Sequence, residues 1–191
     1  MKLVILDRDG TINIDSDEFI KSPQEWEPLP GALEAIAKLN HGGWHVVVAT
    51  NQSGLGRGLF DVVSLNAIHA KMHKMLATVG ARVDAVFYCP HTPDDNCACR
   101  KPKPGLFLQI GERLGVDLKG VPTAGDSARD LQAGSAAGCE PHLVLTGKSA
   151  DWRDRGTPPD CPPHTIVHLD LMAFAEFLTA RDVLLRQPPS P

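Results

Sequence analysis

The stretch Leu3-Val4-Ile5-Leu6-Asp7-Arg8-Asp9-Gly10-Thr11 joins a short apolar run to two carboxylates that are one residue apart. Residues i and i+2 of an extended segment lie on the same face, so we expect Asp7 and Asp9 to converge while Arg8 points elsewhere. Gly10 then lets the backbone turn away. Two carboxylates at a strand end suit a nucleophile and a proton-transfer partner beside a bound cation.

Outward from this stretch, apolar β-branched runs alternate with segments of helical periodicity. The sequence predicts strands at 2–6, 44–49, 85–88, 121–124, 142–145 and 165–168. It predicts helices at 31–40, 64–79, 106–114 and 128–137, and a last helix that begins over 171–178. This order indicates an α/β protein with a Rossmann-like, doubly wound and mostly parallel sheet, covered by helices on both faces.

The alternation continues without a linker, so we expect one domain over 1–186 and a disordered Pro-rich tail at 187–191. The chain has 191 residues, of which 42% are hydrophobic and 22% charged, with a formal net charge of −4. This balance argues against a nucleic-acid partner. Apolar runs stay well below the ~18 residues of a membrane span. Because the N-terminus does not read as a signal peptide, we expect a cytoplasmic protein with no membrane partner.

Polar side chains follow several of the predicted strands, and the carboxyl ends of parallel strands face one crevice. Thr50 and Asn51 offer a hydroxyl and an amide that can hydrogen-bond a phosphoryl oxygen. The alternative is that they cap a helix N-terminus, a place that both residue types favour. The two interpretations are compatible, because a helix N-terminus also attracts phosphate.

A third carboxylate comes from Asp126 in the segment Gly125-Asp126-Ser127-Ala128-Arg129-Asp130. Mg²⁺ prefers oxygen ligands and keeps several waters, so Asp7, Asp126 and the backbone carbonyl of Asp9 would suffice to hold it. The alternative role for Asp126 is an N-cap of the helix that follows. Asp130 lies four residues after Asp126 and can share its face.

Positive charge comes from the loop Arg100-Lys101-Pro102-Lys103-Pro104, whose prolines keep it out of a helix. Lys101 can neutralise charge on a phosphoryl group, and Arg100 can grip a second anion bidentately. The alternative is an ordinary solvated basic loop.

Three cysteines and a histidine gather just before this basic loop, as Cys89, His91, Cys97 and Cys99. Such a set predicts a closed, tetrahedral Zn²⁺ site with a structural role, against the alternative of unrelated cysteines. Since the zinc loop (89–101) runs into Arg100 and Lys101, we expect zinc to order the segment that carries these charges. The other cysteines, Cys139 and Cys161, are interpreted as ordinary thiols, and His69 and His73 as packing or surface residues.

The combination of Asp-x-Asp-Gly-Thr, Thr50-Asn51, the basic loop and Gly-Asp-x-x-x-Asp resembles the haloacid dehalogenase superfamily of phosphatases. The resemblance implies an aspartyl-phosphate route. In it Asp7 is the nucleophile, Asp9 is the general acid and base, Thr50 and Lys101 stabilise the phosphoryl group, and Asp126 holds Mg²⁺.

The Cys-Pro-His zinc loop and Cys-Arg-Lys-Pro narrow the resemblance to one subgroup, which contains heptose 1,7-bisphosphate 7-phosphatases and the related histidinol-phosphate phosphatase domains. It implies an enzyme without a large cap, acting on a small phosphosugar for lipopolysaccharide heptose, with histidinol phosphate as the alternative substrate. We expect a monomer. The implied substrate contacts are Asp15, Ser16, Asp17, Glu18, Asn51, Gln52, Ser53 and Arg100.

Two other classes of protein use similar residues. A receiver-like phospho-switch also gathers Asp, Thr and Lys around Mg²⁺, but its phosphorylated Asp would follow an interior strand of the chain, whereas Asp7 follows the first. A zinc-dependent interaction module is the third class. Neither class predicts turnover of a phosphate ester, so phosphate release separates both from an enzyme.

Overall fold

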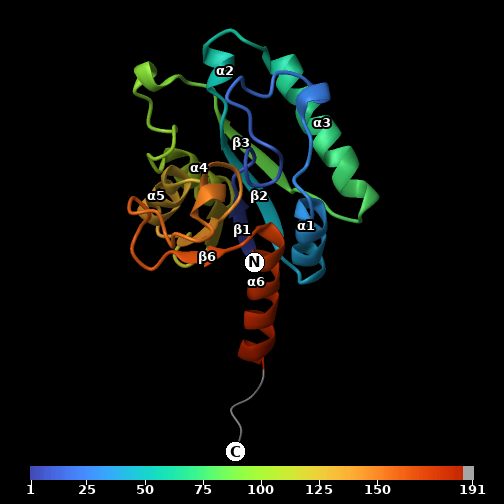
Figure 1. Ribbon diagram of the computed structural model, residues 1–191, viewed down its shortest axis with the longest axis vertical. Helices are drawn as coiled ribbons and strands as arrows, with labels where there is room; N and C mark the ends of the chain where they lie inside the picture. The colour runs from blue at the N-terminus through green and yellow to red at the C-terminus, as the bar shows by residue number, and fades with distance from the viewer. Residues whose placement is uncertain (187–191) are drawn as a thin grey trace, which may run out of the picture.

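The computed structural model describes residues 1–186 and contains a six-stranded sheet with the order β3-β2-β1-β4-β5-β6 (Figure 1). Each neighbouring pair of strands is parallel. The strands are β1 (Leu3–Leu6), β2 (His45–Asn51), β3 (Ala85–Cys89), β4 (Pro122–Gly125), β5 (Glu140–Val144) and β6 (Ile166–His168). The predicted strands are therefore present, with ends that move by one or two residues.

The helices are α1 (Ala32–His41), α2 (Ser53–Gly56), α3 (Val62–Thr78), α4 (Gly105–Leu114), α5 (Ala128–Ala136) and α6 (Leu171–Arg186). Short 3₁₀ turns lie at Pro23–Glu25, Pro93–Asp95 and Gly147–Trp152. Helix α3 begins before the predicted residue 64 because the Asp61 side chain accepts a hydrogen bond of 2.8 Å from the Ser64 amide and caps the helix. The short α2 was not predicted.

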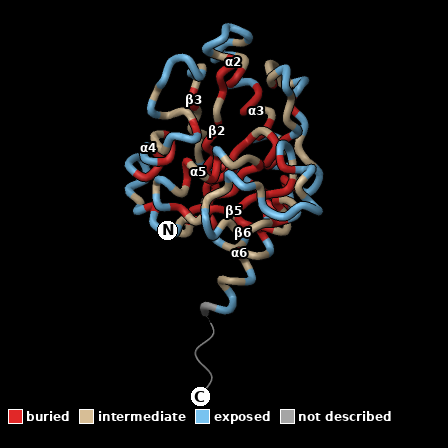
Figure 2. The backbone as a smooth tube through the Cα atoms, turned by 60° about the vertical axis from the view of Figure 1, so that its left-hand side comes forward, coloured by how far each residue is buried: buried red, intermediate tan, exposed pale blue. Residues whose placement is uncertain are grey.

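Alternation along β1 explains how helices come to cover both faces of the sheet. Val4 and Leu6 pack in a core cluster with α1, α3 and α6. Leu3 and Ile5 point the other way and pack with α4 and α5. The buried segments, red in Figure 2, run through the centre of the molecule between these helices.

The strand order places the candidate residues. The chain starts in the middle of the sheet with β1, adds β2 and β3 on one side, and then crosses to add β4, β5 and β6 on the other. Ligands of such sheets bind at the carboxyl ends of the strands, where the order reverses. Here that point lies beyond β1 and β4, where Asp7 and Asp126 follow. The predicted fold class is confirmed, and residues 1–186 form no large cap.

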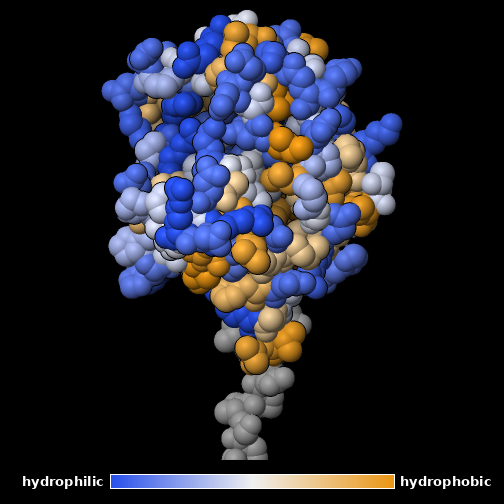
Figure 3. Space-filling view, in the orientation of Figure 1, coloured by the Kyte–Doolittle hydropathy of each residue, from blue (hydrophilic) through white to orange (hydrophobic). Residues whose placement is uncertain are grey.

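The surface in Figure 3 is mostly hydrophilic, with scattered apolar patches. One of these patches lies over the end of α6, where Val183 and Leu184 are exposed. Within 1–186, no helix has the length and apolar character needed to cross a membrane. The predicted disordered tail, 187–191, lies outside the described residues. The single-domain boundary stays a prediction.

Candidate active site

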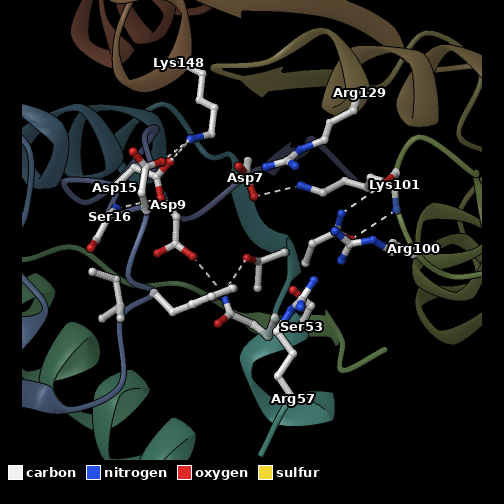
Figure 4. Close-up of a pocket in the computed structure, with 16 residues that line it drawn as sticks. Asp7, Asp9, Asp15, Ser16, Ser53, Arg57, Arg100, Lys101, Arg129 and Lys148 are labelled. Atoms are coloured by element: carbon white, nitrogen blue, oxygen red, sulfur yellow. Dashed lines mark hydrogen bonds and ion pairs between the residues drawn. The ribbon is translucent and has the colours of Figure 1, made fainter. Parts of the chain in front are cut away.

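A polar cavity of about 230 Å³ opens at the carboxyl ends of the strands (Figure 4). The residues that line it are Asp7, Asp9, Asp15, Ser16, Asp17, Phe19, Ile20, Thr50, Asn51, Gln52, Ser53, Arg57, Arg100, Lys101, Arg129 and Lys148. Five separate segments of the sequence, one after each of the strands β1 to β5, therefore meet here, as expected for the carboxyl ends of parallel strands.

Lys101 lies at the floor of this cavity, almost completely buried. Its Nζ is 2.7 Å from Asp7 Oδ1 and 2.7 Å from Asp130 Oδ1, and it donates a hydrogen bond of 2.8 Å to the Ala49 carbonyl. Burial alone would lower the pKa of this ammonium, but the neighbouring Asp130 and Asp7 carboxylates raise it. Lys101 is therefore a fixed positive charge beside Asp7.

The carboxylates around Lys101 form a candidate cation site. Oxygen atoms of Asp7, Asp126 and Asp130 lie within 4.8 Å of one another, and all three residues are buried. Burial and the Asp130 charge raise the pKa of Asp7 to about 6, and the same causes raise that of Asp126. Lys101 does not balance this negative charge alone, so the cluster fits a hard divalent cation that prefers oxygen ligands.

Asp126 is held from three sides. The Lys148 backbone amide donates a hydrogen bond of 2.7 Å to its Oδ2. Gly10 and Gly147 both have positive φ, and a Cβ at either would collide with the Asp126 carboxylate. The helix cap is supplied by the next residue, Ser127, so the alternative role of Asp126 as an N-cap is wrong.

Asp9 reaches the same cavity as Asp7, as predicted, but it lies outside the carboxylate cluster. Its oxygens accept hydrogen bonds from Asn13 Nδ2 at 2.9 Å and from Gln52 Nε2 at 2.8 Å. The expectation that Arg8 points elsewhere is wrong. Because β1 ends at Leu6, strand alternation no longer holds at Arg8, and its guanidinium turns back to bond the Asp9 carboxylate.

The residues at the end of β2 have separate tasks. Thr50 is buried against the cavity, and its Oγ1 accepts a hydrogen bond of 3.0 Å from Gln52 Nε2. The Asn51 side chain exchanges two hydrogen bonds of 3.1 Å with the Lys101 backbone and so fixes the basic loop. Ser53 begins α2, whose N-cap is Gln52, so neither Thr50 nor Asn51 caps it.

Three guanidinium groups line one side of the cavity. Arg57, Arg100 and Arg129 approach its centre from one side in Figure 4, with Lys148 and Asp15 on the other. Arg57 and Arg129 form no ion pair with a carboxylate of the described chain. Sequence reasoning missed Arg57, Arg129 and Lys148. For Arg129, its place three residues after Asp126, in the first turn of a helix, was a usable signal.

The entry loop contributes Asp15, Ser16 and Asp17 to the cavity, and their contact with a substrate stays a prediction. Lys148 Nζ lies 3.1 Å from Asp15 Oδ2 and 3.3 Å from Asp17 Oδ1, which balances part of the loop's acidity. Glu18 does not line the cavity. A turn closed by the Phe19 amide on the Ser16 carbonyl at 3.1 Å leaves it exposed on the outside, so its predicted contact is corrected.

The predicted zinc donors gather in space. Ligand atoms of Cys89, His91, Cys97 and Cys99 lie within 4.8 Å of one another. The three Sγ–Sγ distances are 3.1, 3.5 and 3.6 Å. Thiolates around tetrahedral zinc, with Zn–S of about 2.3 Å, lie roughly 3.8 Å apart, so the cluster is close to the size that zinc needs. Three thiols and an imidazole are also the donor types of structural zinc.

Comparison with known proteins agrees with this geometry. The HAD-hydrolase-like family model matches residues 98–171. The D-glycero-β-D-manno-heptose-1,7-bisphosphate 7-phosphatase of Bordetella bronchiseptica is 59% identical over 178 residues, covering 93% of this chain and 98% of that protein. The Pseudomonas aeruginosa protein of the same name is 52% identical, with coverages of 92% and 97%.

A crystal structure of the B. bronchiseptica D,D-heptose 1,7-bisphosphate phosphatase, complexed with magnesium and phosphate, has a TM-score of 0.89 to this chain at 58% identity. The match covers 95% of this chain and 99% of that one.

Proposed function

This chain belongs to the D-glycero-β-D-manno-heptose-1,7-bisphosphate 7-phosphatases, within the haloacid dehalogenase-like hydrolases, and we propose that it removes the 7-phosphate of that bisphosphate with Mg²⁺. The observation that best supports this substrate assignment is the 59% identity to the B. bronchiseptica enzyme, over 93% of the chain. The cavity supports the chemistry, because it holds a buried carboxylate, a second carboxylate and a fixed ammonium at one place.

In the first step Asp7 attacks the phosphorus atom of the 7-phosphate, and the bond from phosphorus to the sugar oxygen breaks. Asp9 gives a proton to that oxygen, so the sugar leaves as an alcohol and the phosphoryl group stays on Asp7. In the second step Asp9 takes a proton from a water molecule, whose oxygen attacks phosphorus. The bond from Asp7 to phosphorus then breaks and releases inorganic phosphate.

Charge stabilisation by fixed groups lowers the barrier of both steps. Lys101 supplies a buried positive charge beside the Asp7 oxygen, and Thr50 supplies a hydroxyl from the end of β2. Bound Mg²⁺ would neutralise charge between Asp7 and the phosphoryl group. The ligands would be Asp7, Asp126 and the Asp9 backbone carbonyl. Asp130 would add negative charge to the cluster and hold Lys101 in place through their ion pair.

The phosphate that does not react needs a second anion site. We assign it to Arg100, with Arg57 and Arg129 adding positive charge at the same side of the cavity. Guanidinium groups suit this task because they bind phosphate oxygens bidentately. The entry-loop residues Asp15, Ser16 and Asp17 would contact the sugar hydroxyls.

Zinc has a structural role in this proposal. Cys89, His91, Cys97 and Cys99 would hold it. The same loop is tied to the site, because Arg100 Nη1 donates a hydrogen bond of 3.3 Å to the His91 carbonyl. Zinc would thus fix the segment that carries Arg100 and Lys101. The product, heptose 1-phosphate, would feed nucleotide-activated heptose for lipopolysaccharide. A cytoplasmic location and a monomeric state stay predictions.

Turnover of two substrates tests the proposal. With Mg²⁺, we expect kcat/KM for the heptose bisphosphate to exceed that for histidinol phosphate by roughly 100-fold or more, the range that paired polar contacts can supply. Asp7→Asn should abolish both activities, while Asp117→Asn, in an exposed turn, should leave them unchanged. A preference for histidinol phosphate would overturn the substrate assignment, and turnover by Asp7→Asn would overturn the covalent route.

A further inference from the structure

Arg8 is a fully buried cation that the reaction scheme does not use. Its Nε donates a hydrogen bond of 3.0 Å to Asp9 Oδ1, and its Nη2 donates one of 3.0 Å to Asp9 Oδ2. The guanidinium therefore grips both oxygens of the Asp9 carboxylate at once. Such a fork-to-fork pair fixes the rotation of a carboxylate as well as its position.

The remaining side of the guanidinium meets His69, which projects from α3. Arg8 Nη1 lies 3.1 Å from His69 Nε2. An arginine can only donate, so Nε2 must accept and its proton must sit on Nδ1. Burial first, and then the Arg8 charge, lower the pKa of His69 to about 4, which keeps the ring neutral and able to accept. His69 thus gives Nη1, the third nitrogen of the Arg8 guanidinium, a hydrogen-bond partner.

Asp9 is held from the other side as well. Asn13 and Gln52 donate to its Oδ1 and Oδ2, so side chains from the loop after β1 and from the end of β2 complete the grip. The Asp9 side chain nevertheless keeps 21% of its surface exposed, and Asp9 lines the cavity. Part of an otherwise immobilised carboxylate is therefore exposed to the cavity.

We propose that Arg8 and His69 are positioning residues, which hold the Asp9 side chain at the angle needed to pass a proton to the leaving oxygen. Burial alone would raise the pKa of Asp9, but the Arg8 charge and the hydrogen bonds from Asn13 and Gln52 lower it, so the side chain is ionised in the free enzyme. Asp9 takes up the proton when the substrate binds, from the monoanionic form of the reacting phosphate group, and then passes it to the leaving oxygen. The inference rests on the proposed role of Asp9 as general acid. A single buried ion pair would need only Arg8. The histidine on a separate helix, placed so that its accepting nitrogen meets the one free corner of the guanidinium, prevents Arg8 from turning away from Asp9.

Two substrates with different leaving groups distinguish a positioning role of His69 from a merely structural one. A sugar alcohol is a poor leaving group that needs the proton of Asp9, whereas the phenolate from p-nitrophenyl phosphate leaves without one. If His69 acts through Asp9, its loss harms the first substrate far more than the second. If His69 only stabilises the fold, its loss harms both equally.

The experiment measures kcat/KM for the heptose bisphosphate and for p-nitrophenyl phosphate. His69→Leu should lower the first by roughly ten-fold, the loss of one hydrogen bond to a charged group, and the second by less than about two-fold. His69→Gln keeps an accepting oxygen near the position of Nε2 and should recover most of the activity. His73→Leu, one turn further along α3 and exposed, is the matched control and should match the wild type with both substrates.

Asp9→Asn separates this inference from the function on which it rests. If the wild type hydrolyses the bisphosphate but Asp9→Asn lowers kcat/KM equally for the bisphosphate and for p-nitrophenyl phosphate, the proposed role of Asp9 has failed. If Asp9→Asn lowers kcat/KM for the bisphosphate more than for p-nitrophenyl phosphate, but His69→Leu lowers both equally, the positioning role is refuted. If the wild type hydrolyses only histidinol phosphate, the substrate assignment fails and the same comparison is made with that ester.

A spectroscopic measurement on the intact enzyme covers the case in which a variant does not fold. The ¹⁵N chemical shifts of His69 at neutral pH should show a protonated Nδ1 and an unprotonated Nε2. A protonated Nε2 would contradict the hydrogen bond from Arg8, and with it the proposal.

Discussion

Replacing Lys101 by methionine should disable and destabilise the protein together. The ammonium lies 2.7 Å from Asp7, 2.7 Å from Asp130 and 2.8 Å from the Ala49 carbonyl, and only 1% of the side chain is exposed. Methionine has a similar volume but no charge, so Asp7 and Asp130 lose the buried ammonium that pairs with both of them, with little change in packing.

The size of the effect follows from this burial. Removing one partner of a buried ion pair costs about 3–5 kcal/mol. Because the pKa of Asp7 is already raised to about 6, part of the excess charge is relieved by proton uptake. We therefore expect a loss near 3 kcal/mol at pH 7 without divalent cations, at the lower end of that range. Added Mg²⁺ should restore a share of it. The kcat should fall by roughly 100- to 1000-fold, as for other fixed charge-stabilising donors.

Urea unfolding with and without Mg²⁺, together with phosphate release, measures both effects. Lys103→Met is the matched control, since Lys103 lies in the same loop but is exposed, with Nζ 2.6 Å from Asn96 Oδ1. Its free energy of unfolding should change by less than about 0.5 kcal/mol. An unfolding midpoint and a kcat for Lys101→Met that both equal those of the wild type would refute the reasoning.

Further changes test other parts of the account. Cys97→Ala should lose zinc, measured by elemental analysis, and most of its turnover, because the loop that zinc fixes carries Lys101. Cys139→Ala should keep both, and a zinc-free but fully active Cys97→Ala protein would contradict the link between zinc and activity. Arg100→Ala should raise KM for the bisphosphate about ten-fold and barely change that for a monophosphate ester; equal shifts would exclude a second-phosphate site. Burial and the neighbouring His142 lower the pKa of His168 to about 4, so the folded state takes up fewer protons than the unfolded state as pH falls below about 6.5. The wild type should then lose on the order of 2 kcal/mol more stability than His168→Leu between pH 7 and pH 4.5, and parallel curves would contradict this.

The sheet and most of the cavity were predictable because each rests on a local pattern. The apolar run before Asp7 gives a buried strand, and parallel strands present their following residues at one edge. Asp7, Thr50 and Asp126 could be found in this way, whereas Lys101 was found from its place in the basic loop. The zinc donors were predictable for a similar reason, since they lie close together in the sequence.

What could not be predicted depends on how the chain turns after a strand ends. Alternation predicted that Arg8 points away from Asp9, but β1 stops at Leu6 and the turn that follows brings the guanidinium back. His69 lies 61 positions further on, and nothing local to α3 shows that it meets Arg8. Similarly, Glu18 shares the acidity of the entry loop, yet a turn at Phe19 leaves it outside the cavity.

The central claim is that this protein removes one particular phosphate from a sugar bisphosphate. The most direct measurement is ³¹P NMR of D-glycero-β-D-manno-heptose 1,7-bisphosphate during incubation with the enzyme and Mg²⁺. We expect the 7-phosphate resonance to disappear as the resonance of inorganic phosphate grows, while the 1-phosphate resonance persists. Loss of the 1-phosphate, or no release of phosphate at all, would contradict it.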